Sequence, residues 1–280
     1  MISITLPSPA KLNLFLHILN RREDGYHNLQ TLFQILDYGD QLSFTINKQP
    51  EIHVISDLEE VKPQDNLVFK AAQALQQATD CPWGCEIQLE KKLPIGAGLG
   101  GGSSNAATTL VGLNDLWQCD LSLDELAKIG RNLGADIPVF VKGFSAFAEG
   151  IGDQLTPISL KDFWYLVVTP KIKVSTQQIF SHSELTRNAP AIKIRALSEE
   201  LYRNDCQSVV ETLYPEIKQV LDWLKRFGNP LMTGTGASLY CRFDSEIEAK
   251  QAQITVPNSW NSFVAQGVNQ SPLHRQLKNL

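Results

Sequence analysis

Five glycines fall within positions 96–102, and their spacing is the strongest sign of chemistry in the chain. They lie in the stretch Pro94-Ile95-Gly96-Ala97-Gly98-Leu99-Gly100-Gly101-Gly102-Ser103-Ser104, between a strand predicted over residues 86–93 and a helix predicted over residues 103–117. Glycine permits positive φ and close approach to a ligand, and a helix start offers unpaired N–H groups to an anion. A turn with capping serines is the alternative, but it requires fewer glycines. The run therefore predicts a phosphate-binding loop.

The spacing of these glycines does not fit the commonest phosphate-binding motifs. Gly96, Gly98 and Gly101 match G-x-G-x-x-G, but a dinucleotide fold needs a second parallel strand that ends in an acidic residue. Here a second helix is predicted over 122–133, and Asp120 lies in the loop before it. No Gly-Lys-Ser/Thr closes the run as in a P-loop, and the protein-kinase motifs His-Arg-Asp and Asp-Phe-Gly are missing. The loop is therefore expected to bind phosphate by another scheme.

Lys11 and Asn13 are polar residues within the apolar pattern of a strand predicted over 10–19. Alternation with period two places both side chains on the same face of that strand. Asp136 stands in a predicted turn over 134–138, at the start of a further helix. A solvated lysine and a helix-capping aspartate are the simpler interpretations. The chemical alternative is a carboxylate that accepts a hydroxyl proton beside a lysine that stabilises negative charge.

Strands and helices alternate along both halves of the chain, which indicates an α/β or α+β protein with a boundary near residues 150–162. Asp65 is predicted to cap a helix, and Ser122 with Glu125 forms a capping box for another. Residues 170–196 are polar and irregular, and a second glycine turn spans 233–237. Further strands are expected over 32–36, 41–46, 146–149, 164–169, 238–243 and 262–267, and further helices over 196–201, 206–213, 216–227 and 245–254.

The composition limits the class of protein. The 280 residues include 25 Lys and Arg against 30 Asp and Glu, a net charge of −5, with no basic block, so a general nucleic-acid binder is not expected. Neither a secretory signal nor a membrane span is predicted, and the expected location is the cytoplasm. The five cysteines are scattered, and Cys81 and Cys85 lack a second ligand pair, which disfavours a metal or redox role there.

In combination, these motifs resemble those of the GHMP kinases, the family of galacto-, homoserine, mevalonate and phosphomevalonate kinases. Residues 94–107 match its phosphate loop, Pro-x-x-x-Gly-Leu-Gly followed by Gly or Ser and Ala. The two further glycines resemble one branch, the kinases that act on 4-diphosphocytidyl-2-C-methyl-D-erythritol. Four other segments agree in family order and span nearly the whole chain: Ser-Pro-Ala-Lys-Leu-Asn-Leu at 8–14, Arg-Glu-Asp-Gly-Tyr-His at 22–27, Leu-Gly-Ala-Asp-Ile-Pro-Val-Phe at 133–140, and Thr-Gly-Thr-Gly-Ala at 233–237.

The resemblance implies an α+β, two-domain GHMP kinase fold. An N-terminal domain like domain 2 of ribosomal protein S5 is expected over residues 1–155, and a ferredoxin-like C-terminal domain over 156–280. The implied reaction is ATP-dependent phosphorylation, with Mg²⁺, of the 2-hydroxyl of 4-diphosphocytidyl-2-C-methyl-D-erythritol in the non-mevalonate isoprenoid precursor pathway. The expected partner is this small molecule, with neither nucleic acid nor membrane, and the chain is expected to be a monomer or a weak homodimer.

The resemblance also implies roles for the residues around the phosphates. Lys11 and Asp136 match the catalytic pair of the family, and residues 94–104 match the loop that binds the ATP phosphates. Asn66 is expected near the adenine. A Mg²⁺ ligand is expected at Ser104 or its neighbour, and the glutamate that some members use as a second ligand has no counterpart here.

At the other end of the substrate, the resemblance implies a site for the cytosine ring. Tyr26 and His27 fall where the family holds this ring, and Phe180 is expected to stack on its other face. Asn13 is expected to contact the substrate beside Lys11.

Two other functions stay open at this point. One is a kinase of the same fold that acts on homoserine or a mevalonate derivative, which Tyr26 and His27 after Gly25 disfavour. The other is an inactive binding protein or sugar-sensing regulator on the same scaffold, which the presence of both Lys11 and Asp136 disfavours.

Overall fold

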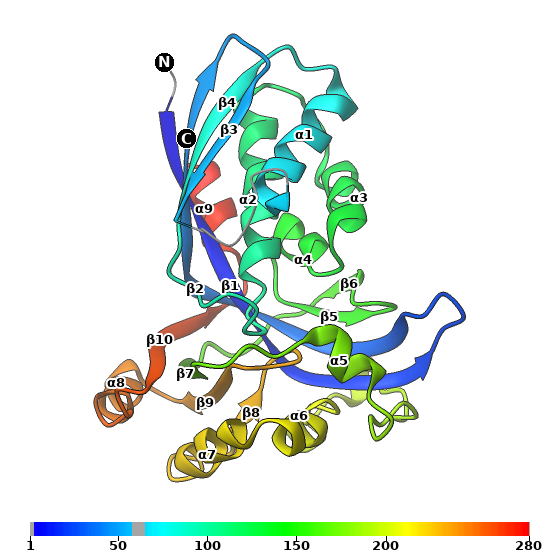
Figure 1. The fold of residues 1–280 in the computed structure, drawn as a ribbon, viewed down its shortest axis with the longest axis vertical. Coiled ribbons are helices and arrows are strands. Elements are labelled where there is room, and N and C mark those ends of the chain that lie inside the picture. Colours follow the sequence, from blue (N-terminus) through cyan, green and yellow to red (C-terminus); the bar gives the residue numbers. More distant parts are fainter. Residues whose placement is uncertain (1–2, 58–64, 280) are drawn as a thin grey trace.

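Two long antiparallel strands run through the molecule and connect its upper and lower parts (Figure 1). In this computed structural model, which describes residues 3–57 and 65–279, β1 covers Ser3–Arg21 and β2 covers His27–Asn47. The strand predicted over 10–19 is confirmed as the middle of β1. Lys11 and Asn13 share a face as predicted, since Lys11 Nζ donates to Asn13 Oδ1 over 2.6 Å.

β2 is continuous where the sequence pattern predicted two strands separated by a turn at 38–40. Gly39 lies opposite Pro9 in the ladder, and a Cβ at Gly39 would lie 2.0 Å from the Ser8 carbonyl oxygen. The glycine therefore permits a close crossing of two backbones, and the ladder continues through it with a shift in register.

The upper part packs helices against one face of the sheet (Figure 1). β4 (Gly84–Glu90) pairs antiparallel with β2, and β3 (Ile52–Ser56), which the pattern did not predict, pairs in parallel with β4. The other elements here are α1 (Leu67–Thr79), α2 (Gly101–Leu116), α3 (Leu123–Leu133), α4 (Ile137–Lys142), β5 (Ala146–Glu149) and β6 (Gln154–Pro157).

The lower part contains strands in the order β10-β7-β9-β8, all antiparallel. α5, which Ser175 caps, lies within the segment predicted to be irregular, and two 3₁₀ turns at 194–196 and 199–201 replace the helix predicted over 196–201. The elements are β7 (Trp164–Pro170), α5 (Thr176–Ser181), α6 (Gln207–Leu213), α7 (Pro215–Leu224), β8 (Leu231–Met232), β9 (Leu239–Phe243), α8 (Glu246–Ile254) and β10 (Trp260–Val268).

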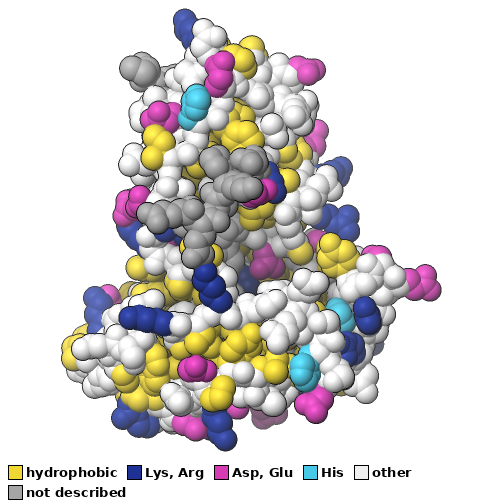
Figure 2. Space-filling view, viewed as in Figure 1, with side chains coloured by type: hydrophobic (Ala, Val, Ile, Leu, Met, Phe, Trp, Pro, Cys, Tyr) yellow, Lys and Arg dark blue, Asp and Glu magenta, His cyan; other side chains and the backbone are white. Residues whose placement is uncertain are grey.

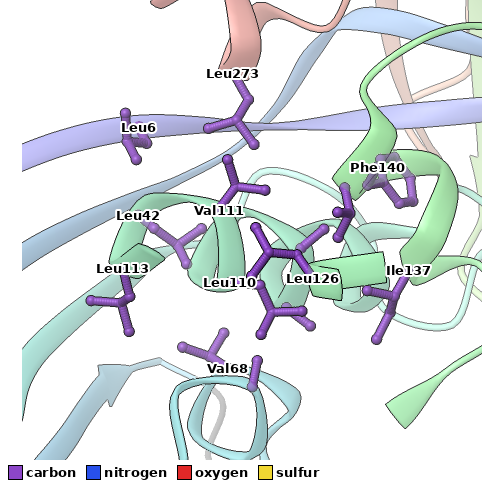
Figure 3. Packing of buried hydrophobic residues seen from close by; sticks show 14 of the residues in the cluster. Leu6, Leu42, Val68, Leu110, Val111, Leu113, Leu126, Ile137, Phe140 and Leu273 are labelled. Carbon is purple, nitrogen blue, oxygen red and sulfur yellow. The ribbon is translucent and has the colours of Figure 1, made fainter. Parts of the chain in front are cut away.

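The end of the chain joins the two parts. β10 pairs with β2 where Gly267 and Val268 face Leu36 and Ile35, so the strands form one connected sheet. The last helix, α9 (Pro272–Leu277), which the sequence pattern missed, returns to the upper part. Figure 3 shows Leu273 of α9 close to Leu6 and Val111. The division at 155/156 stays a prediction, and α9 packs on the upper core although it follows that division.

Three groups of buried apolar side chains hold the fold together. One lies between the upper sheet and α1–α4, one fills the lower part, and one connects them around Phe15, Leu99 and Tyr240. Among the strands that the structure describes, only β3 and β4 pair in parallel. The α+β prediction is therefore confirmed over the α/β alternative.

The predicted helix caps are partly right. Ser122 and Glu125 form the predicted capping box of α3, with both hydrogen bonds present. The prediction for Asp65 is wrong, because Asn66 caps α1: Asn66 Oδ1 accepts from the Val68 backbone N–H over 2.9 Å. Asn66 directly precedes the first helical residue, where a short acceptor reaches the free N–H groups.

Glycines 96, 98 and 100 all adopt positive φ, which shapes the loop before α2. A Cβ at Gly98 would lie 2.2 Å from the Thr233 carbonyl oxygen, whereas a Cβ at Gly96 would meet no atom of the described part of the chain within 4 Å. The loop is therefore pressed against the second glycine turn at Gly98 and is open at Gly96.

This difference predicts unequal effects of alanine at the two positions. Gly96→Ala adds only backbone strain and is expected to lower the free energy of unfolding by about 1 kcal/mol. Gly98→Ala adds the clash as well and is expected to cost roughly 2–4 kcal/mol and to weaken ATP binding. Urea unfolding of both variants measures this, and equal losses at the two positions would contradict the close packing of Gly98 on Thr233.

Two histidines, the buried His17 and the half-buried His274, are held neutral. Nε2 of His17 lies 3.1 Å from the Leu201 carbonyl oxygen, and Nε2 of His274 lies 2.9 Å from that of Val141. The Nδ1 atom of each ring is buried and has no hydrogen-bond partner among the residues that the structure describes. Burial lowers the pKa of both side chains below the ordinary value of 6.5, helped by Arg203 at His17 and by Lys278 at His274. A second proton would have no acceptor on either ring.

This burial predicts that the free energy of unfolding falls as the pH drops below 6.5. In that range the unfolded chain binds more protons than the folded chain, so the slope against pH is positive, up to about 1.4 kcal/mol per pH unit for each histidine. His274→Gln is expected to reduce the slope between pH 6.5 and 5. An unchanged slope in His274→Gln would contradict the prediction.

Candidate active site

A cleft of about 1250 Å³ lies between the glycine loop, β1, the start of α4, α5 and the second glycine turn. The residues that line it include every residue from Pro94 to Ser103, together with Lys11, Asn13 and Asp136. Its other end contains Tyr26, His27 and Phe180. Figure 2 shows a hollow between the upper and lower parts on the face it presents. The structure thus brings nearly all of the predicted site residues to one cleft.

Lys11 is the buried centre of this cleft. Its side chain is 3% exposed, and Nζ donates to Asn13 Oδ1 at 2.6 Å and to the Gly98 carbonyl oxygen at 3.0 Å. Nζ also lies 3.3 Å from Asp136 Oδ2, whose side chain is 35% exposed. A buried ammonium group needs such compensation. Lys11 is therefore fixed by three elements, while the carboxylate beside it stays accessible from the cleft.

Thr233 connects this centre to the lower part of the molecule. Its hydroxyl accepts from the Asn13 backbone N–H at 2.9 Å, and its proton is within reach of Asn13 Oδ1 and the Gly98 carbonyl oxygen, both at 3.2 Å. Asn13 Nδ2 donates to Thr31 Oγ1 at 2.8 Å. The sequence pattern predicted a second glycine turn at 233–237 but contained no signal for the role of this hydroxyl.

The glycine loop has the geometry of an anion site. α2 begins after Gly100, which has φ +72° and provides no side-chain cap, so the first N–H groups of the helix have no cap acceptor. Ser103 lines the cleft. Ser104, in contrast, is fully buried, accepts from the Ser8 hydroxyl at 2.9 Å, and donates its N–H to the Gly100 carbonyl oxygen at 2.8 Å. Of the two serines, Ser103 is the one placed to meet a ligand.

A buried polar network, which sequence reasoning missed, supports the loop from below. Asp40 is 1% exposed and accepts from the backbone N–H groups of Lys92 and Leu93 at 2.7 and 2.8 Å. It also accepts from Asn105 Nδ2 at 2.9 Å and pairs with Lys91 Nζ. Asp40 thus connects β2 to both ends of the loop. The sequence placed it in a turn, because the Tyr38-Gly39-Asp40 run resembles one.

The aromatic end of the cleft is asymmetric. The rings of His27 and Phe180 stack with centroids 5.2 Å apart, whereas Tyr26 is 60% exposed. A base inserted between two rings needs about 3.5 Å on each side, so no base fits between His27 and Phe180 as they stand. Burial, Arg187 and Arg21 lower the pKa of His27. Tyr26 offers an exposed ring face, and His27 offers a neutral polar edge.

Asn66 lines the cleft beside Leu67, near the loop that precedes α1. Its Oδ1 is occupied as the helix cap. Its Nδ2 has no partner among the described residues, so both N–H donors of this amide are available to a ligand.

The described residues contain no group of three or more His, Cys, Asp or Glu side chains that could hold a metal ion. Asp136 and Ser103 bring oxygen atoms to the cleft beside the loop. Mg²⁺ prefers oxygen ligands and is commonly held by phosphates and water with one or two carboxylates. The residues present therefore fit a Mg²⁺ ion that arrives with a nucleotide.

Comparison with known proteins agrees with this geometry. The N-terminal domain model of the GHMP kinases matches residues 66–144, and the C-terminal model matches residues 186–261.

None of the helices that the structure describes is long and apolar enough to cross a membrane.

Several relatives align over nearly the full chain. A protein of Marinobacter nauticus named 4-diphosphocytidyl-2-C-methyl-D-erythritol kinase is 53% identical over 282 residues, which cover 99% of this chain and 98% of that protein. A Pseudomonas aeruginosa protein of the same name is 49% identical over 279 residues, covering 100% and 99%.

Solved structures agree as well. A crystal structure of 4-(cytidine 5'-diphospho)-2C-methyl-D-erythritol kinase matches with a TM-score of 0.82 and 31% identity, over 95% of this chain and 100% of that one. The homoserine kinase from Cytophaga hutchinsonii shares the fold at 16% identity, with a TM-score of 0.67 over 96% of each chain. Both halves of the predicted two-domain fold are thereby confirmed, and the chain belongs to the GHMP kinase family.

Proposed function

We propose that this chain transfers the γ-phosphoryl group of ATP to the 2-hydroxyl of 4-diphosphocytidyl-2-C-methyl-D-erythritol. One observation carries the proposal: Lys11 Nζ lies between the Asp136 carboxylate and the Gly98 carbonyl oxygen, at the edge of a glycine loop shaped for phosphate. Relatives about 50% identical over the full chain bear the name of this kinase. A donor site and a proton acceptor therefore meet in one cleft.

The reaction asks the protein mainly to position groups and to stabilise charge. The substrate hydroxyl oxygen forms a bond to the γ-phosphorus, and the bond from that phosphorus to the β–γ bridging oxygen breaks, which releases ADP. Asp136 orients the hydroxyl and accepts its proton. Lys11, held rigidly 3.3 Å from that carboxylate, stabilises the negative charge that develops on the oxygen.

The loop holds the phosphates during transfer. Its N–H groups, the start of α2 and Ser103 are placed to bind the β- and γ-phosphates. Mg²⁺, when bound, neutralises charge on these phosphates, with Asp136 and Ser103 as the oxygen donors at hand. Asn66 supports the adenine through its Nδ2, and Ser104 supports the loop from within the core.

The substrate lies from Asp136 toward the aromatic end of the cleft. Tyr26 is expected to stack on one face of the cytosine ring, and Phe180 is expected to stack on the other face. His27 is expected to form a hydrogen bond with the edge of the ring. Asn13 is expected to contact the hydroxyl-bearing part beside Lys11. Monomeric or weakly dimeric assembly, a cytoplasmic location and the absence of nucleic-acid partners stay predictions.

The alternative kinases of the same fold act on small alcohols that carry no nucleobase. The aromatic end of this cleft, with Tyr26, His27 and Phe180, would have no function toward homoserine or mevalonate. Incubation with labelled ATP and each alcohol in turn, followed by product mass, tests the proposal. Transfer to homoserine or mevalonate but not to the cytidine compound would overturn it.

Asp136→Asn is expected to lower kcat by about 10²–10⁴-fold, because the amide keeps the shape but accepts no proton. Lys11→Met is expected to lower it by at least about 10²-fold through loss of charge stabilisation. ATP binding, measured by calorimetry without Mg²⁺, should change little in Asp136→Asn, since this side chain is proposed to act on the hydroxyl.

The matched control is Asp124→Asn. Asp124 lies on the surface in an ion pair with Lys142, and its side chain is 80% exposed, so turnover should be unaffected. Full turnover in Asp136→Asn would exclude the proposed role of this carboxylate.

A further inference from the structure

Arg187 fixes the protonation pattern of His27. Its Nε–H donates to His27 Nε2 over 3.1 Å. A guanidinium group has donors only, so His27 Nε2 must present its lone pair. The neutral ring then carries its proton on Nδ1, which is the less common tautomer of a free imidazole side chain.

Arg187 is itself held by the backbone at the end of α5 and just after it. One terminal nitrogen donates to the Phe180 and His182 carbonyl oxygens at 2.9 and 2.7 Å, and the other donates to the Leu185 carbonyl oxygen at 3.1 Å. The ring of Phe180 stacks on His27. The imidazole is therefore positioned by its neighbours in both plane and tautomer.

The second ring nitrogen of His27, Nδ1, is free to meet a ligand. His27 lines the cleft, and its Nδ1 has no hydrogen-bond partner among the residues that the structure describes. Nδ1 is also absent from the set of fully buried, unpaired polar atoms, so it keeps some contact with solvent. The arrangement thus presents a single N–H donor to whatever occupies the aromatic end.

We propose that Arg187 is a positioning residue that fixes His27 as an Nδ1–H donor and so selects cytosine over uracil in the nucleotide part of the substrate. The inference rests on the proposed function. Cytosine N3 carries a lone pair that accepts from this donor, whereas uracil N3 carries a hydrogen that would oppose it. A buried donor left facing another donor typically costs about 10- to 100-fold in binding.

The charges around the ring agree with this assignment. Burial lowers the pKa of His27, and Arg187 and then Arg21 lower it further, so the neutral ring prevails near pH 7. The assignment itself depends on the direction of the Arg187 hydrogen bond, which leaves Nε2 no proton.

The first test reads the tautomer directly in the full chain without substrate. Nitrogen-15 NMR of the histidine rings, with the His27 signals identified by their loss in His27→Gln, should show a protonated Nδ1 and an unprotonated Nε2. Arg187→Met should shift the ring toward the Nε2–H form. A protonated Nε2 in the unmodified chain would overturn the proposal.

The second test compares kcat/KM for the cytidine compound and for its uridine analogue. The unmodified chain should prefer cytidine, and Arg187→Met should lower this preference about tenfold, mainly through KM for the cytidine compound. In a His27→Ala background the same change should have no further effect on the preference, because Arg187 acts through His27. The control, Arg226→Met, alters an exposed arginine packed on Trp223 and should keep the preference.

The outcomes separate the two claims. If Arg187 only holds the segment after α5, Arg187→Met will raise KM equally for both compounds and leave the ratio unchanged, which overturns the inference but not the proposed function. Absence of transfer to the cytidine compound by the unmodified chain would overturn the proposed function and, with it, the base selection.

Discussion

The burial of one ammonium group is the constraint on which the rest of the site depends. Lys11 Nζ is almost fully removed from water, so its charge must be compensated within the protein. The compensation comes from Asn13 on the same strand, Gly98 in the loop and Asp136 at the start of α4. Elements far apart in the sequence are thereby held within a few ångströms of one lysine.

The other parts of the site support this arrangement. Thr233 bonds Asn13 and approaches Gly98, so the lower part of the molecule closes against the same lysine. Below the loop, Asp40 takes four donors and connects β2 to Asn105 of α2. Such a network is stable only when all members are satisfied, so the loop is held rigidly from two sides. A rigid loop suits a reaction that depends on positioning.

Much of this could be predicted from sequence because it is local. The period-two pattern of residues 10–19 places Lys11 and Asn13 on one face, and the glycine run marks the loop. The capping box at Ser122 marks the start of α3. Each signal depends on residues that are close in the chain and on a single element.

The rest could not be predicted because it depends on contacts between distant segments. Asp40 resembles a turn residue until Lys92, Leu93 and Asn105 are placed around it. Arg187 lies in a polar stretch without a pattern, and only folding brings it to His27. The short α5 is too brief to show periodicity.

The central claim is that Lys11 and Asp136 act as one unit on the substrate hydroxyl. A double-mutant cycle on kcat, with Lys11→Met, Asp136→Asn and the combined variant, tests it most directly. If the two residues act together, the kcat of the combined variant should be no lower than that of the slower single variant. Losses that multiply in the combined variant would show that the two side chains act independently and would contradict the account.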